Sequence, residues 1–389
     1  DRGERNLIYV SVIDTKGNIV EQRNFNIVNG IDYKEKLKQK ELDRDNARKN
    51  WKEIGKIKDL KEGYLSLVVH EIAKLVVKYN AIITMEDLNQ GFKRGRFKVE
   101  RQVYQKFETM LINKLNYLVD KDLAVDQEGG LLRGYQLTYI PESLKVLGRQ
   151  CGYIFYVPAA YTSKIDPTTG FVAIFNYKGM TDKDFVTSFD SIKYDDERGL
   201  FAFEFDYENF VTHKVEMARN KWTVYTYGER IKRKFKNGLW DTAEKVDLTY
   251  QMRSILEKYE IEYNKGQDIL EQIEELDEKA QNGICKEIKY LVKDIVQMRN
   301  SLPDNAAEDY DAIISPVINN NGEFFDSTRG DEDKPLDADA NGAYCIALKG
   351  LYEVMQIKKN WNEETEFPRK ELKIRHQDWF DFIQNKRYL

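Results

Sequence analysis

The chain opens with alternating apolar and polar residues and then changes to the spacing of amphipathic helices. The alternation predicts strands over Asn6–Ile13 and Ile19–Ile27. The intervening Asp14-Thr15-Lys16-Gly17-Asn18 is typical of a turn, so we expect an antiparallel hairpin. Helices are predicted over Lys34–Ile57 and Lys61–Tyr79. The apolar face of the second helix comprises Leu65, Val68, Val69, Ile72 and Val76.

A new strand pattern follows these helices. The apolar run over residues 81–85 predicts a strand that ends on Glu86. A helix that leads directly into a strand of this kind predicts a parallel α/β unit. Apolar spacing then predicts a helix over Val103–Leu118 and a short strand over Ile154–Val157. The first 160 residues therefore indicate an α/β domain.

The pattern changes again between about residues 171 and 325. Aromatic strands such as Phe201-Ala202-Phe203-Glu204-Phe205 alternate with helical stretches, which indicates an insertion domain. From Phe324 the earlier pattern resumes. It continues into predicted helices over Ala340–Ile357 and Trp379–Asn385.

The composition sets few limits on function. The chain has 389 residues, of which 33% are charged, and its net charge is only −5. This small net charge does not exclude nucleic acid as a partner, because basic residues can cluster locally. The cysteines Cys151, Cys285 and Cys345 have no paired spacing, so we expect a reduced protein without disulfides. No apolar stretch is long enough to span a bilayer, and a cytoplasmic protein is the plain expectation.

Three acidic residues lie in motifs that suit metal chemistry. Asp1 opens Asp1-Arg2-Gly3-Glu4-Arg5, Glu86 ends a predicted strand, and Asp339 precedes Ala340-Asn341-Gly342. An α/β sheet places its chemistry at strand ends, and three adjacent carboxylates would repel one another without cations between them. Divalent metal with phosphate as a further partner fits such a set.

Two nearby acids are rival ligands. Asp87 directly follows Glu86, and Asp337 lies two residues before Asp339. On a strand, residues two apart share a face, so the composition leaves the choice between Asp337 and Asp339 open.

The three acidic motifs, in this order, resemble the split RuvC nuclease of type V CRISPR effectors, most closely the V-A subtype, over essentially the whole chain. The resemblance implies an RNase H-like α/β domain assembled from three discontinuous segments, with a basic bridge helix and an α/β Nuc insertion. The implied boundaries are RuvC segment I at 1–33, truncated at its start, a bridge helix at 34–59, RuvC segment II with a lid at 60–150, Nuc at 151–325 and RuvC segment III at 326–389. We expect a recognition lobe of the same effector to precede this chain.

The resemblance also implies roles for single residues. Asp1, Glu86 and Asp339 would hold two Mg²⁺ ions, with Mn²⁺ able to substitute. Arg299 would contact the scissile strand; from the residues alone it reads as a surface arginine at a helix end. Ser301 and Asp309 would be weaker neighbours in the same site.

Basic segments are the expected nucleic-acid contacts. The stretch from Gly91 to Arg101 interleaves basic and aromatic residues after the Glu86 strand, and the resemblance makes it a lid; a solvated loop is the alternative. Its candidate contacts are Lys93, Arg94, Arg96, Lys98 and Arg101. Eleven Lys and Arg residues lie between Lys34 and Lys61, which resembles the bridge helix. Trp51 in this helix would anchor the recognition lobe or pack in the chain's own core.

A structural zinc is not expected. The segment Thr162–Gly170 resembles the start of a zinc ribbon in related transposon-encoded nucleases, but both cysteine positions hold other residues. Tetrahedral zinc sites of this kind need thiolate or imidazole ligands.

The resemblance implies an RNA-guided DNA endonuclease of prokaryotic antiviral defence. Its partners would be a CRISPR guide RNA, target double-stranded DNA and single-stranded DNA, with no membrane. One site would cut both target strands, and the activated enzyme would also degrade unrelated single-stranded DNA. The alternatives are a non-cleaving guide-directed binding module and a guide-independent resolvase or transposase nuclease. We expect the isolated chain to be inactive or poorly stable.

Overall fold

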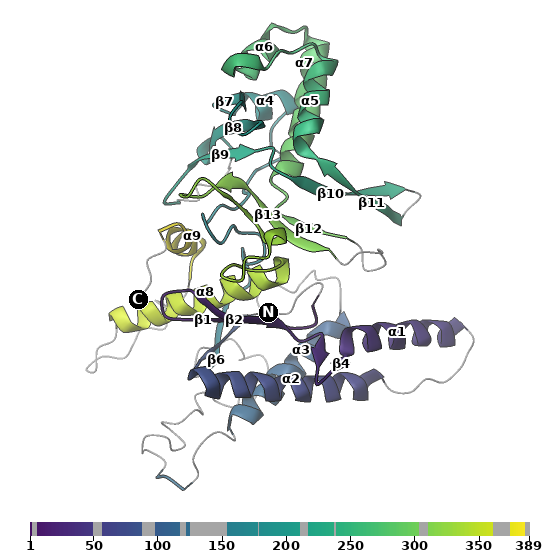
Figure 1. The fold of residues 1–389 in the computed structure, drawn as a ribbon, viewed down its shortest axis with the longest axis vertical. Coiled ribbons are helices and arrows are strands. Elements are labelled where there is room, and N and C mark those ends of the chain that lie inside the picture. Colours follow the sequence, from purple (N-terminus) through teal and green to yellow (C-terminus); the bar gives the residue numbers. More distant parts are fainter. Residues whose placement is uncertain are drawn as a thin grey trace. The chain divides into compact units, whose positions relative to one another are not determined.

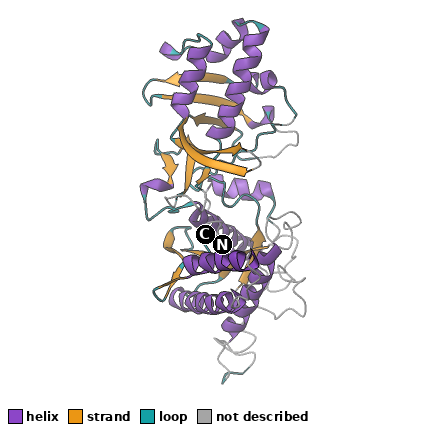
Figure 2. Cartoon of the chain, turned by 90° about the vertical axis from the view of Figure 1, so that its right-hand side faces the viewer, coloured by secondary structure: helices purple, strands orange, loops and turns teal. Residues whose placement is uncertain are grey.

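A computed structural model of the chain describes residues 1, 6–49, 57–87, 98–116, 122–124, 154–177, 179–210, 217–236, 239–302, 310–360 and 374–385 (Figure 1). The chain divides into two compact units. Unit 1 comprises Asp1–Ala160 and Gly342–Ile374, and unit 2 comprises Tyr161–Asn341 and Arg375–Leu389. Each unit has its own hydrophobic core and mixes helices with strands (Figure 2).

Unit 1 begins with the predicted hairpin. Strands β1 (Tyr9–Ile13) and β2 (Ile19–Asn24) pair antiparallel. The turn forms because Asp14 Oδ1 accepts hydrogen bonds from the backbone N–H groups of Lys16 and Asn18. The two-residue strands β3 (Ile27–Val28) and β4 (Ile31–Asp32) follow and pair with each other.

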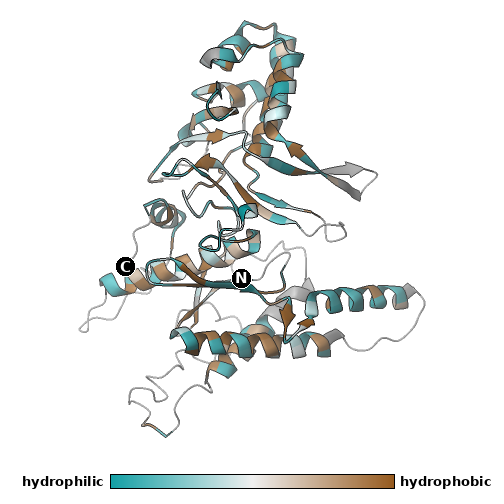
Figure 3. Cartoon of the chain, in the orientation of Figure 1, coloured by the Kyte–Doolittle hydropathy of each residue, from teal (hydrophilic) through white to brown (hydrophobic). Residues whose placement is uncertain are grey.

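The helices of unit 1 begin earlier than predicted. Helix α1 (Tyr33–Lys49) is capped by Asp32, whose Oδ1 accepts the N–H of Glu35 at 2.8 Å. The predicted continuation to Ile57 passes through residues 50–56, outside the described residues, and Ile57 itself starts helix α2 (Ile57–Tyr79). Figure 3 shows α1 as mainly hydrophilic and α2 with hydrophobic bands. This difference follows from burial, because α2 places Val68 and Leu65 in the core.

The parallel α/β prediction is confirmed. Strands β5 (Ile83–Asp87) and β6 (Ile154–Pro158) pair in parallel, and Glu86 lies opposite Val157. Helix α3 (Lys98–Asn116) packs against α2. The core between these elements includes the fully or almost fully buried residues Val68, Leu111, Leu115 and Ile154.

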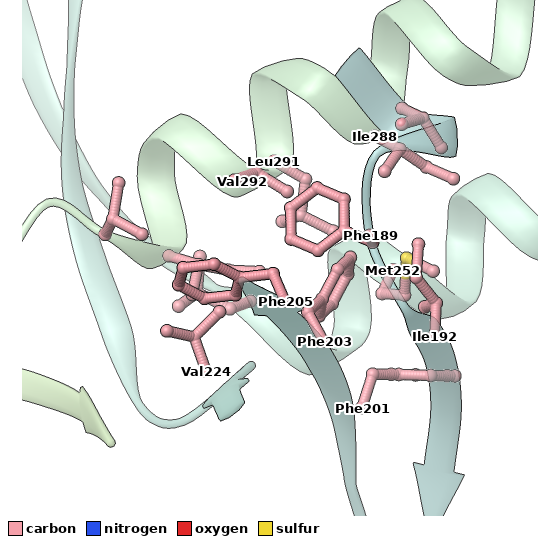
Figure 4. Packing of buried hydrophobic residues seen from close by; sticks show 14 of the residues in the cluster. Phe189, Ile192, Phe201, Phe203, Phe205, Val224, Met252, Ile288, Leu291 and Val292 are labelled. Carbon is pink, nitrogen blue, oxygen red and sulfur yellow. The ribbon is translucent and has the colours of Figure 1, made fainter. Parts of the chain in front are cut away.

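Unit 2 contains an antiparallel sheet of β7 (Ser191–Asp195), β8 (Leu200–Asp206) and β9 (Lys221–Tyr225). The alternation in β8 directs Phe201, Phe203 and Phe205 to one face, where all three are buried. They meet apolar residues of helices α5 (Leu248–Lys258) and α7 (Glu278–Ile295), including Leu291 and Val292 (Figure 4). The aromatic strand predicted from the sequence therefore forms the centre of this core.

The remaining elements of unit 2 carry the candidate site. Strands β12 (Arg299–Ser301), β13 (Asp311–Ile318) and β14 (Phe324–Asp326) form a second sheet. Helix α8 (Ala338–Asn360) begins in unit 2 and belongs to unit 1 from Gly342 onward. The other elements are the hairpin β10 (Glu229–Lys236) and β11 (Leu239–Asp247), helices α4 (Asp182–Thr187), α6 (Ile269–Glu275) and α9 (His376–Asn385), and short 3-10 helices at Tyr207–Asn209, Asn264–Gly266 and Ser327–Arg329. In the described part of the chain, no helix has the length and apolar character needed to cross a membrane.

Candidate active site

Asp337 and Asp339 have different surroundings at the start of α8. The Oδ1 atom of Asp337 accepts the N–H of Ala340 at 2.6 Å and so caps the helix. Asp339 lies in the first turn and is fully buried. The expectation that these two acids share the face of a strand is wrong, because the helix begins at Ala338. Of the two, Asp339 is the acid that enters a buried charged cluster.

The cluster forms around one guanidinium group. Arg299 Nη2 lies 2.8 Å from Asp339 Oδ1 and 3.0 Å from Asp311 Oδ2, and Arg299 Nε lies 3.2 Å from Asp311 Oδ1. Arg299 thus binds Asp311 with two nitrogen atoms and Asp339 with one. The side chains of Arg299, Asp311 and Asp339 are only 10%, 6% and 1% exposed. We call Arg299, Ser301, Asp311 and Asp339 the Arg299 cluster.

Ser301 and Asp311 complete this cluster across a β ladder. Strands β12 and β13 are antiparallel, with Ser301 opposite Asp311, and Ser301 Oγ donates a hydrogen bond to Asp311 Oδ1. Burial raises the pKa of Asp311, while the positive charge of Arg299 acts in the opposite direction and the charge of Asp339 adds to the rise. The arginine is therefore the group that compensates two nearby buried carboxylates.

Asp311 was not among the predicted site residues, and the predicted Asp309 lies outside the described residues. The alternative interpretation of Arg299, as a surface residue at a helix end, is wrong because it begins a strand and is largely buried. Asp311 does carry a weak signal, since it directly precedes the apolar run Ala312-Ile313-Ile314. Only the pairing of β12 with β13 connects it to Arg299.

Buried polar residues anchor β12. Asn300 is fully buried; its Oδ1 accepts the N–H of Ile231 at 3.0 Å and its Nδ2 donates to the carbonyl of Met298 at 3.0 Å. Arg230, on the neighbouring strand, donates to the carbonyl of Ile295 at 3.0 Å. Burial lowers the pKa of Arg230 to about 10. These contacts restrict the backbone on either side of Arg299.

In unit 1, Glu86 lies near the carboxyl end of the parallel strand β5 and is half-buried. Lys349 of α8 is buried beside the end of the neighbouring strand, and its Nζ donates to the carbonyl oxygens of Pro158 at 2.7 Å and Ala160 at 2.5 Å. Burial lowers the pKa of Lys349 to about 8, and the negative charge of Glu86 opposes this effect. Lys349 was not among the predicted site residues, although a lysine within the apolar stretch from Cys345 to Leu351 is a signal.

Other buried carboxyl groups lie in unit 1. Burial raises the pKa of Glu353 to about 8. It also raises the pKa of Glu108 to about 7, and the charge of Asp87 adds to that rise. Asp87 is thus coupled to a carboxyl group of α3.

The predicted metal ligands fall in both units. Asp1 lies in unit 1, where its carbonyl accepts the N–H of Tyr9 at 2.8 Å, and Asp339 lies in unit 2. Among the described residues, no group of three or more His, Cys, Asp and Glu side chains is close enough to hold a metal ion. The chemistry of the ligands nevertheless fits a divalent metal, because carboxylate oxygens are the donors that Mg²⁺ prefers. The guanidinium on Asp339 shows that this buried carboxylate already accepts a cation.

The structure describes part of the predicted nucleic-acid contacts. Lys93, Arg94, Arg96 and Trp51 lie outside the described residues. Lys98 and Arg101 lie in α3, which begins five residues before the predicted helix start at Val103. The last part of the expected lid is therefore helical. The assignment of all these residues to nucleic acid stays a prediction.

Comparison with protein families agrees with this architecture. A family model described as a RuvC nuclease domain matches residues 1–388. A RuvC domain implies an RNase H-like α/β fold and a nuclease, that is, a hydrolase of nucleic acid, and RuvC nucleases generally use divalent metals such as Mg²⁺. Since the match spans nearly the whole chain, the protein belongs to the RuvC nuclease domain family.

Proposed function

We propose that this chain is the nuclease part of an RNA-guided DNA endonuclease of the type V-A CRISPR kind. In this proposal, Asp1, Glu86 and Asp339 bind divalent metal and Arg299 binds the phosphate of the strand to be cut. The observation that carries it is the contact between Arg299 and Asp339, because it holds a phosphate-binding group directly beside a proposed metal ligand.

The chemistry of the residues supports phosphodiester hydrolysis. Divalent metals held by carboxylates activate water and stabilise the charge of the leaving oxygen. A guanidinium is a planar, charged donor group of the kind that binds phosphate, and Asp311 orients that of Arg299 through contacts with its Nε and Nη2 atoms. Because the cluster is shielded from water, its electrostatic interactions are stronger than on an open surface.

The guided mode of action rests on the resemblance and on helix α1. Lys36, Lys38 and Lys40 of this helix are exposed, as a helix that binds a nucleic-acid backbone requires. The guide-independent resolvase is the main alternative within the same family. A non-cleaving binding module is a second alternative, although the chain retains all three acids.

Cleavage of labelled single-stranded DNA by the guide-loaded protein tests this function. It would be measured in Mg²⁺, with and without matching target, for the wild type, Glu86→Ala and the exposed control Lys358→Ala. We expect target-triggered cleavage by the wild type and the control and none by Glu86→Ala. Cleavage that requires neither the guide nor the matching target would favour a resolvase-like nuclease. No cleavage by the wild type would favour the binding module.

A further inference from the structure

Lys349 is a buried cation whose charge the proposed chemistry does not use. Lys349 is only 2% exposed, and its ammonium group donates to two backbone carbonyls. Burying a lysine costs free energy unless its donors are satisfied. The two carbonyls offset part of this cost, and they tie Lys349 to the end of β6.

The two carbonyls lie at one end of the parallel strand pair. Pro158 is the last residue of β6 and lies opposite Asp87, one position after the pair of Val157 and Glu86. Among the described residues, the ladder between β5 and β6 ends at this pair, two positions before Ala160. The ammonium of Lys349 thus supplies the donor where the ladder ends, beside the strand end that carries Glu86.

Helix α8 approaches β5 closely at the next residue. A Cβ atom on Gly350 would clash with the Thr84 hydroxyl and would lie 2.8 Å and 2.9 Å from Thr84 Cγ2 and Cβ. Thr84 lies two residues before Glu86 on the same strand. The consecutive residues Lys349 and Gly350 therefore attach α8 to both strands of the pair.

We propose that Lys349 is a positioning residue for Glu86. By holding the end of β6, which pairs with the Glu86 end of β5, it fixes the backbone that would orient the Glu86 carboxylate toward a divalent metal. This inference rests on the proposed function, because it takes Glu86 as a metal ligand. Residues that orient metal ligands without touching the metal commonly change metal affinity by about 10- to 100-fold.

Two effects of the Lys349 charge oppose each other. The charge repels a metal ion, whereas the hydrogen bonds and the attraction to Glu86 maintain the ligand geometry. We expect geometry to dominate, because a ligand must lie within about 0.5 Å of its productive position. Lys349→Met should therefore weaken metal binding, not strengthen it.

The test is a Mn²⁺ titration followed by electron paramagnetic resonance on the intact protein that carries this chain. The variants are Lys349→Met, Lys349→Arg, Glu86→Gln, the Glu86→Gln/Lys349→Met double variant, and the exposed control Lys358→Met on the same helix. We expect Lys349→Met to weaken Mn²⁺ binding at least about 10-fold. The same substitution should add nothing in the Glu86→Gln background, and Lys358→Met should match the wild type.

A second readout is the Mg²⁺ concentration that gives half-maximal cleavage, which should rise for Lys349→Met. Unchanged or tighter Mn²⁺ binding by folded Lys349→Met would overturn the inference. If Lys349→Met does not fold, Lys349→Arg decides, because it keeps a cationic donor but alters its geometry; binding equal to the wild type would then reject the inference. Absence of Mn²⁺ binding by the wild type, or full binding by Glu86→Gln, would instead reject the proposed function.

Discussion

Arg299 Nη2 lies 2.8 Å from Asp339 Oδ1 and joins strand β12 to the first turn of helix α8. The same guanidinium binds Asp311 with two nitrogen atoms. Because all three side chains are nearly buried, water cannot replace a lost partner. The cluster therefore links the stability of unit 2 to its proposed chemistry.

Removing Arg299 should destabilise the protein strongly. Arg299→Ala leaves Asp311 and Asp339 as uncompensated buried carboxylates, and losing one partner of a buried ion pair costs about 3–5 kcal/mol. The matched control is Arg198→Ala, which breaks the more exposed pair with Asp195 and should cost much less, because solvent screens that pair. Chemical denaturation of both variants checks this prediction, and equal losses would contradict it.

The coupling between Arg299 and Asp311 can be measured directly. Asp311→Asn keeps the shape of the side chain but removes its charge, so Arg299 loses its two-nitrogen contact with a carboxylate. A double-mutant cycle with Arg299→Lys should give a coupling free energy above about 1 kcal/mol. The same Asp311→Asn variant should cleave DNA at least about 10-fold more slowly, because a misplaced group costs catalytic rate. Additive effects on stability and wild-type cleavage would show that Asp311 does not orient Arg299.

Gly350→Ala tests the close approach of α8 to β5. The added methyl group meets Thr84, so we expect a loss of about 1–3 kcal/mol in the free energy of unfolding. Thr84→Ala in the same protein removes the clashing hydroxyl and methyl groups and should recover part of this loss. Gly63→Ala is the control, because Gly63 is an exposed helical residue with open space at its Cβ position. It should be neutral or slightly stabilising.

Glu353 should make stability depend on pH. Burial raises its pKa from an ordinary 4.5 to about 8, so between these pH values the folded state binds more protons than the unfolded state. Its contribution to stability is therefore most favourable below pH 4.5 and falls as pH rises toward 8. Glu353→Gln removes this titration, and its Tm should exceed that of the wild type by at least about 2 °C at pH 8.5.

The difference in Tm between Glu353→Gln and the wild type should shrink toward pH 5. Glu257→Gln, at an exposed position on α5, serves as the control and should show no such trend. Thermal unfolding across this pH range provides the measurement. A constant difference in Tm would mean that the Glu353 carboxyl group does not titrate differently in the folded state.

Local sequence patterns were sufficient to predict those helices and strands whose formation depends on neighbouring residues. The hairpin of β1 and β2 follows from alternation and from an Asp-rich turn that satisfies its own backbone. The strand that carries Glu86 and its parallel character follow from a helix leading into an apolar run. The sequence predicts the start of α8 two residues too late. From the sequence, Asp337, which caps the helix, cannot be distinguished from any other acid near a helix start.

The order and local context of Asp1, Glu86 and Asp339 already indicated a RuvC-type nuclease, because such motifs are read from neighbours along the chain. The partners of those acids came only from tertiary structure. Arg299 meets Asp339 across 40 positions, Asp311 rather than Asp309 lies opposite Ser301, and Lys349 reaches a carbonyl 191 positions away. Contacts of this kind depend on strand register and on how a helix packs against a sheet. Periodicity along the chain carries no information on either, because a shift of one residue in register exchanges every partner.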